Sequence, residues 1–73
     1  YYGCLIESDK TNDVSVLIED SDGVSSHTTR MKHLMPGTED GRMDTPNNPV
    51  RIARGLRVTV VGTGATAYIL HGQ

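Results

Sequence analysis

The stretch LRVTVVGTGATAYIL, residues 56–70, decides the fold expected for this chain of 73 residues. Apolar residues at 56, 58 and 60 alternate with polar ones, and residues 65–70 repeat this period of two, which a half-buried strand needs. Between the two arms, Gly62 and Gly64 can supply the positive φ angles of a hairpin turn. We therefore predict an antiparallel hairpin, at the centre of a β-meander over residues 50–71.

The same turn also matches a more specific motif, one found in dinucleotide-binding sites. Residues 62–67 read G-T-G-A-T-A, which fits the dinucleotide-binding pattern G-x-G-x-x-A. That site needs a helix directly afterwards and an acidic residue about 20 positions further on. Only nine residues follow Gly64, and they form a poor helix. We assign the glycines to turn geometry and predict no cofactor.

The composition limits the core that the chain can build. It has no Phe, no Trp and three Tyr, and Cys4 is its single cysteine, so no internal disulfide can form. A domain of this size buries only roughly 60% of the surface that its unfolded chain exposes. We predict one β domain, residues 1–73, that gains further burial as a homo-oligomer or inside a larger assembly.

The charge and hydropathy of the chain argue against two classes of binding partner. No stretch approaches the about 20 apolar residues of a membrane span, and no signal peptide is recognisable, so no membrane partner is expected. The net charge of −2 argues against a general nucleic-acid binder. Acidic residues gather in the first third of the chain, and Arg51, Arg54 and Arg57 lie near the hairpin. This split indicates either two solvated surfaces or a head-to-tail contact between copies.

Alternation and turn residues place the remaining elements. We predict strands over residues 1–6, 13–19 and 24–29, with turns at 9–12 and at 20–23, the second of which contains Gly23. In the first strand, Tyr2, Cys4 and Ile6 are expected to share one face.

The second half of the chain is less regular. Residues 30–35 fit either a strand or one helical turn, and residues 36–49 are expected to form a long surface loop without a strand. A short strand over residues 50–53 then leads through Gly55 into the hairpin. The sum is about six short strands without a helix, which predicts an all-β fold: a small antiparallel sandwich or barrel with one long loop containing Pro and Gly.

No group of residues has the spacing of a metal site. Cys4, His27, His33 and His71 are too far apart in sequence for zinc. The acidic stretch at residues 19–23 fails the EF-hand pattern at both ends of the loop, which favours a plain turn.

Nor does any stretch predict catalysis. There is no G-x-S-x-G elbow, and Cys4 lies inside an apolar strand, where a thiol behaves as a small hydrophobe. We predict no catalytic residue and no enzyme.

The sequence does resemble one family, and two segments carry the likeness. They are VSVLIED at residues 14–20 and VRIARGLRVTVVGTGATAYIL at residues 50–70. Together they are similar to the small β-sandwich virion proteins of tailed bacteriophages. The loop at 36–49 departs from the pattern, because a shorter link is expected there in such chains.

This resemblance implies a repeated structural role, as a capsid decoration or stabilisation protein or a head–tail component, without catalysis. It implies packing on copies of itself or on the major capsid or tail protein, and a location in the virion after assembly in the host cytoplasm. An alternative is a small β-barrel that binds single-stranded nucleic acid or another ligand through its tyrosines and arginines. The candidate interface residues are Tyr1, Tyr2, Tyr68, Arg51, Arg54, Arg57, Pro36, Pro46 and Pro49.

Overall fold

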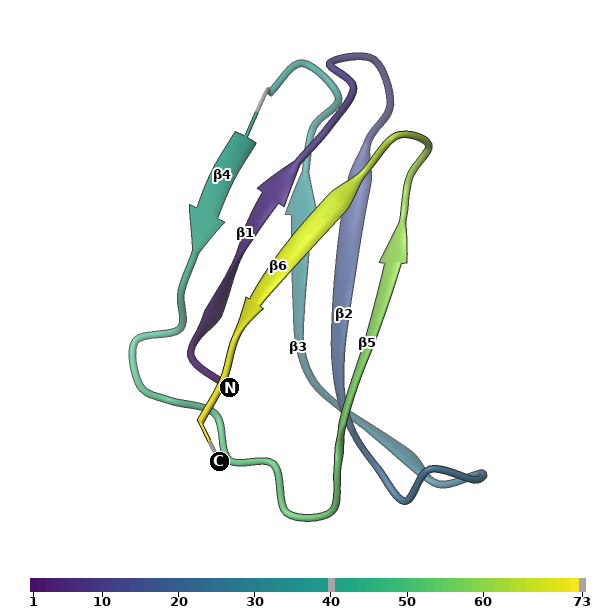
Figure 1. Ribbon diagram of the computed structural model, residues 1–73, viewed down its shortest axis with the longest axis vertical. Helices are drawn as coiled ribbons and strands as arrows, with labels where there is room; N and C mark the ends of the chain where they lie inside the picture. The colour runs from purple at the N-terminus through teal and green to yellow at the C-terminus, as the bar shows by residue number, and fades with distance from the viewer. Residues whose placement is uncertain (40, 73) are drawn as a thin grey trace.

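The computed structural model describes residues 1–39 and 41–72, and these residues form strands, turns and loops (Figure 1). The fold is all-β, as predicted, with two small antiparallel sheets that are compatible with a β-sandwich. None of the described residues belongs to a helix long and apolar enough to cross a membrane. The six strands are β1 (Gly3–Glu7), β2 (Val14–Ser21), β3 (His27–Met35), β4 (Gly41–Asp44), β5 (Leu56–Val61) and β6 (Thr66–Leu70).

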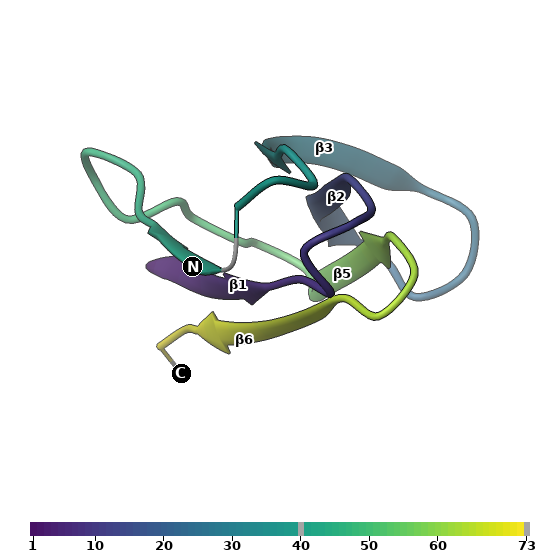
Figure 2. The ribbon, with the colours of Figure 1, turned by 90° about the horizontal axis from the view of Figure 1, so that it is seen from above.

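Each sheet has three strands, in the orders β4-β1-β6 and β3-β2-β5. Seen from above, β1 and β6 lie in one layer, and β2 and β3 lie in another (Figure 2). Strand β2 is the centre of its sheet, with Val16 opposite His33 of β3 and Val60 of β5. The β2–β3 register skips Arg30, which is therefore the extra residue of a β-bulge.

The core lies between the two central strands. From β1 it takes Cys4 and Ile6, and from β2 it takes Val14, Val16 and Ile18, all at most 2% exposed. These side chains occupy alternate positions along their strands, so one face of each strand is removed from water. The core is completed by Tyr1 and Met35 and by half-buried residues, including Leu56, Val58, Ala67 and Ile69.

The hairpin prediction for residues 56–70 is half right. Both arms are strands, but they do not pair with each other: β5 pairs with β2, whereas β6 pairs with β1 in the other sheet. The turn therefore carries the chain from one layer to the other. An alternating pattern tells which face of a strand is buried but does not tell which strand lies beside it.

Gly62 and Gly64 adopt the positive φ angles that were predicted, but the turn they form joins two sheets and not the two strands of a hairpin. Gly62 has φ of 144° and Gly64 has φ of 70°, conformations that disfavour a side chain. A Cβ at Gly62 would also lie 2.7 Å from the backbone oxygen of Asp13. Because a strand, β6, follows this turn, the helix that a dinucleotide site needs does not form here.

Two predictions for the segment before β5 are wrong. Residues 36–49 contain a strand, β4, which pairs with β1 although its sequence, GRMD, has no apolar run. Residues 50–53 are not a strand. Val50 instead makes one reciprocal pair of backbone hydrogen bonds with Tyr1, each 2.9 Å long. Backbone pairing, of β4 with β1 and of Val50 with Tyr1, holds these segments where the side-chain pattern gives no signal.

The early predictions hold with local changes. The second strand runs two residues further than expected, to Ser21. The third begins at His27 and not at residue 24, and residues 30–35 continue it instead of forming a helical turn. The turn at 9–12 is closed by the Asp9 carboxylate, which accepts hydrogen bonds from the backbone of Thr11 and Asn12. The first strand begins at Gly3, and its predicted alternation fails at its start, because Tyr1 is buried while Tyr2 is 49% exposed.

Candidate functional site

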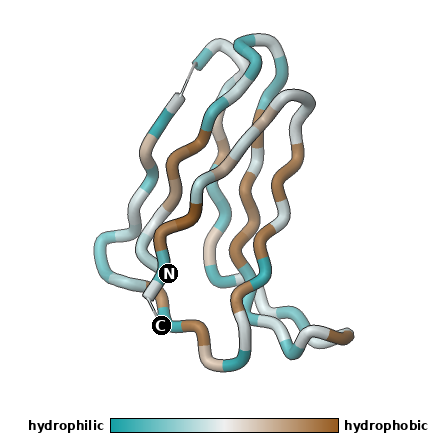
Figure 3. The backbone as a smooth tube through the Cα atoms, in the orientation of Figure 1, coloured by the Kyte–Doolittle hydropathy of each residue, from teal (hydrophilic) through white to brown (hydrophobic). Residues whose placement is uncertain are grey.

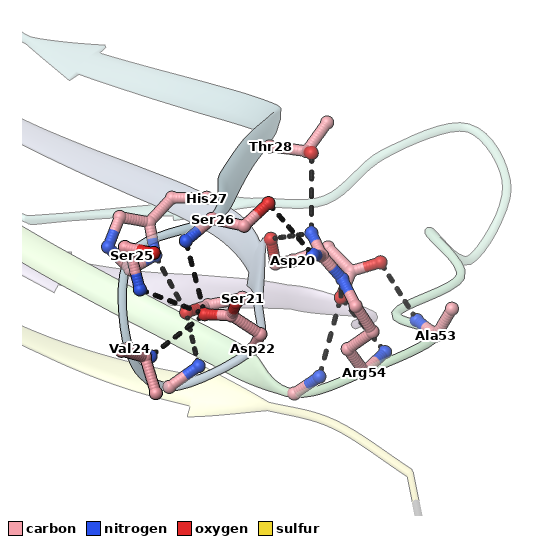
Figure 4. Close-up of polar contacts among 12 residues, drawn as sticks. Asp20, Ser21, Asp22, Val24, Ser25, Ser26, His27, Thr28, Ala53 and Arg54 are labelled. Carbon is pink, nitrogen blue, oxygen red and sulfur yellow. Dashed lines mark hydrogen bonds and ion pairs between the residues drawn. The ribbon is translucent and has the colours of Figure 1, made fainter.

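A carboxylate at the end of β2 fixes the path of the chain before β5. Asp20 accepts backbone hydrogen bonds from Ala53 at 3.1 Å, Arg54 at 2.9 Å and Gly55 at 3.3 Å (Figure 4). The Arg54 guanidinium adds an ion pair, with its Nε 3.5 Å from Asp20 Oδ1. These hydrogen bonds, led by that from the Arg54 amide, lower the pKa of Asp20. We call this group, Asp20 with residues 53–55, the Asp20 clamp.

Arg54 reaches beyond the clamp. Its guanidinium donates to the backbone oxygen of Asp20 at 2.9 Å, and to hydroxyls of Ser26 at 3.1 Å and Thr28 at 3.4 Å. A second arginine, Arg57, lies 3.8 Å from Glu19. Two acidic residues of the first third, Glu19 and Asp20, therefore pair with two of the arginines inside one chain.

The acidic turn after β2 is a plain turn, as the sequence favoured. Asp22 Oδ1 accepts backbone hydrogen bonds from Val24 at 2.8 Å and from Ser25 and Ser26 at 3.1 Å each (Figure 4). These bonds lower the pKa of Asp22, with the Val24 amide as the largest cause. Gly23 lies in this turn with φ of 84° and open space around it.

A buried polar cluster joins the two sheets at their other edge. His33 of β3 is 4% exposed, and its Nε2 lies 2.5 Å from the Tyr1 hydroxyl. Its Nδ1 lies 3.2 Å from Asp44 Oδ2 of β4. Arg42 closes the cluster, with Nε 2.8 Å from Asp44 Oδ1. The arrangement links β3, β4 and the segment before β1; Tyr1 and His33 are buried, whereas Arg42 and Asp44 remain partly exposed.

Burial raises the pKa of two groups, the Tyr1 hydroxyl of this cluster and the neighbouring Cys4 thiol. It is the largest cause that raises the pKa of the Tyr1 hydroxyl, followed by the hydrogen bond and charge of Cys4. Burial likewise raises the pKa of the Cys4 thiol, against a smaller lowering by Tyr1. Both groups are held in their neutral forms, which are poor nucleophiles.

The remaining histidines lie apart from this cluster. His27 Nδ1 contacts the Ser21 hydroxyl at 2.7 Å, and His71 Nδ1 contacts the Gly72 oxygen at 3.0 Å. Within residues 1–39 and 41–72, no three Cys, His, Asp or Glu side chains gather in a way that could hold a metal ion. Cys4 is a free, buried thiol.

The outer face of the β4-β1-β6 sheet is apolar. Leu5 stands opposite Met43 on one side and Tyr68 on the other, and Leu70 stands opposite Gly3 in the next row. Directly opposed residues point to the same face, and Cys4 and Ile6 fill the inner one. Met43 is 53%, Tyr68 54% and Leu70 45% exposed. The hydrophobic stretches of β1 and of the end of β6 are seen in Figure 3. We call Leu5, Met43, Tyr68 and Leu70 the outer apolar face.

The structure brings five of the nine candidate interface residues to one cleft of about 440 Å³. This cleft lies where the segment before β1, the loop before β5 and residues 71–72 meet. Its lining includes Tyr1, Tyr2, Pro49, Arg51 and Arg54, together with His71. Pro36 and Pro46 lie elsewhere, as do Tyr68 on the outer apolar face and Arg57 beside Glu19.

Sequence reasoning missed the polar contacts that organise these sites. Tyr1, a candidate interface residue, is only 6% exposed, and His33 is 4% exposed although nothing in the sequence predicts its burial. The clamp joins residues 33 to 35 positions apart, and His33 meets Tyr1 across 32 positions. The only signal available was the excess of acidic residues near 20 and of arginines near 54. Comparison with known protein families, with characterised proteins and with solved structures finds no match for this chain.

Proposed function

We propose that this protein is a structural virion component of a tailed bacteriophage, a capsid decoration protein or a head–tail component, that acts by packing against copies of itself and against a capsid or tail shell. The observation that carries the proposal is the outer apolar face. Apolar patches of this kind on small domains mark surfaces that are covered in an assembly.

The size of the domain supports the same idea. Among the residues that the structure describes, the large side chains that are fully buried are two isoleucines, two valines, one methionine and one cysteine, which make a thin core. The chain nevertheless leaves Met43, Tyr68 and Leu70 about half exposed. Covering them with a second copy removes apolar surface from water, and this stabilises the folded chain by mass action.

The edges of the same sheet add a second means of contact. Strands β4 and β6 flank β1 and are the outer strands of their sheet. An outer strand presents backbone groups that can pair with a strand of another molecule. A neighbour seated on the outer apolar face would lie beside these edges.

Light scattering of the purified chain over a range of concentrations tests the proposal. The mass should rise above that of one chain as concentration increases, and Tyr68→Lys combined with Leu70→Lys should return it to the monomer. Val24→Lys is the control, because Val24 is 84% exposed but lies on the β2–β3 turn. A chain that stays monomeric at every concentration and does not bind phage particles would disprove this function.

A further inference from the structure

The cleft beside the chain ends has walls from three distant parts of the sequence. Residues 1 and 2 form one side, residues 49–52 and 54–56 form another, and His71 and Gly72 close it. Its volume of about 440 Å³ is in the range of small-molecule sites, about 300–1,000 Å³. The Asp20 clamp holds residues 53–55 and so fixes the wall that carries Arg51.

The charge of this cleft is opposite to that of the chain. None of the described residues that line it is acidic, although the chain carries a net charge of −2. The charge of Arg54 is balanced by Asp20. Arg51 is exposed and makes no hydrogen bond or ion pair with another described residue. Its guanidinium is therefore available to an anion, and an anion there would meet no carboxylate of the lining.

The lining of the cleft also includes an aromatic side chain, that of Tyr2. Tyr2 is 49% exposed, and it lies so close to Gly72 that a Cβ on that glycine would be 2.8 Å from the tyrosine oxygen. The half-buried side chains of Val50, Ile52 and Leu56 supply an apolar floor. A tyrosine ring, an apolar floor and a free arginine within one cleft suit a ligand with a planar ring and a negative charge.

We propose that this cleft binds one nucleotide unit, with the phosphate on the Arg51 guanidinium and the base against the Tyr2 ring. Aromatic stacking next to a cation is how single strands are bound without reading their sequence. The set that the structure assembles is Tyr2, Arg51 and His71. It excludes Arg57, which lies near Glu19, and Tyr68, which lies on the outer apolar face. The unit can be a free nucleotide or part of a single strand.

NMR titration of the ¹⁵N-labelled chain tests this site at low salt. The probes are thymidine 5′-phosphate, a short oligothymidylate, thymidine and inorganic phosphate. Thymidine 5′-phosphate should shift the amide signals of residues 2, 50–52, 71 and 72, with a dissociation constant on the order of 10⁻⁴ M or weaker. Thymidine and inorganic phosphate should each bind more weakly. Tighter binding of the oligothymidylate, with a log–log salt slope of about −0.7 per phosphate contacted, assigns the site to a single strand, and equal binding assigns it to the free nucleotide.

Two variants and one control complete the experiment. Arg51→Gln should weaken binding about three- to ten-fold, as loss of a charge-assisted hydrogen bond at an exposed position does. Tyr2→Leu should weaken nucleotide binding but leave binding of inorganic phosphate unchanged. Arg57→Gln removes the same charge from a residue outside the cleft and should change neither. The proposal is overturned if no shift occurs, if the shifts map elsewhere, or if inorganic phosphate binds as well as the nucleotide.

Discussion

Cys4 combines complete burial with a raised pKa, and both properties make its thiol unreactive while the protein is folded. Reaction with a thiol reagent should therefore require unfolding of the sandwich around β1. We expect modification of the native chain to be at least about 100-fold slower than in denaturant, because folded domains spend little time open. The rate is measured with a chromogenic disulfide at pH 8, with and without guanidinium. A native rate near the denatured one would contradict the burial of this thiol.

Single residues also show which contacts cannot be predicted from the sequence. Cys4 was correctly placed in an apolar strand, because its neighbours in sequence determine that pattern. The roles of Asp20 and His33 depend on partners more than 30 positions away, and a hydrogen-bonding residue gives no sign of which distant amide or hydroxyl it will meet. The burial of Tyr1 has the same origin, because its hydroxyl is satisfied by His33, 32 positions away.

At the scale of elements, the alternation of apolar residues and the positions of turn-forming residues predicted five of the six strands. The period of two predicted the buried faces of β2, β5 and β6 because burial itself imposes that period. It did not predict that β5 and β6 belong to different sheets. Strand β4 was missed because Gly41–Asp44 has no apolar pattern and is held by backbone pairing and by the contacts of Asp44.

The connection from β5 to β6 makes a specific demand on Gly62. An alanine there would combine φ of 144° with a Cβ 2.7 Å from the backbone oxygen of Asp13. We expect Gly62→Ala to lower the free energy of unfolding by about 1–3 kcal/mol, measured by urea denaturation. Gly23→Ala is the control, since Gly23 also has a positive φ, 84°, but nothing lies near its Cβ. Equal losses from both substitutions would show that the contact with Asp13 is unimportant.

Strand β2 supplies a second test, because its two faces have different surroundings. Ile18 is fully buried between the sheets, whereas Leu17, its neighbour, is only partly buried on the outer side. Ile18→Ala should lower the free energy of unfolding by about 2–5 kcal/mol, through lost burial and the cavity left behind. Leu17→Ala should cost about 1 kcal/mol or less. Urea denaturation measures both, and a larger loss at Leu17 would reverse the assignment of faces.

The whole molecule relies on carboxylates to close connections that its small core cannot hold. Asp9 closes the turn before β2, Asp22 closes the turn after it, and Asp20 ties down the loop before β5. Each acts by accepting backbone N–H groups that would otherwise be unpaired. Asp9, Asp20 and Asp22 are thus internal acceptors, and Arg54 and Arg57 offset part of the acidic charge of the first third.

This use of carboxylates sets the acid stability of the protein. The pKa values of Asp9, Asp20 and Asp22 are all lowered by backbone hydrogen bonds, chiefly those from Asn12, Arg54 and Val24. A lowered pKa in the folded state means that the unfolded chain takes up these protons more readily, so stability rises with pH across this range. The contribution is complete above the unfolded value of about 3.9 and is lost as the pH falls through the lower folded-state values.

Urea denaturation between about pH 2 and pH 7 measures this dependence. The midpoint should fall steeply below about pH 4, and Asp20→Asn should lower it at pH 7 and make the acid slope shallower, because one of the three linked protons is removed. Glu7→Gln is the control: the Glu7 side chain is exposed and makes no hydrogen bond or ion pair with another described residue, so both the midpoint and the slope should be nearly unchanged. If Asp20→Asn left the acid slope as steep as in the unaltered chain, the clamp would not be a source of this pH dependence, and the loop before β5 would be held instead by backbone hydrogen bonds, those of Val50 with Tyr1 and of Ser21 with Gly55.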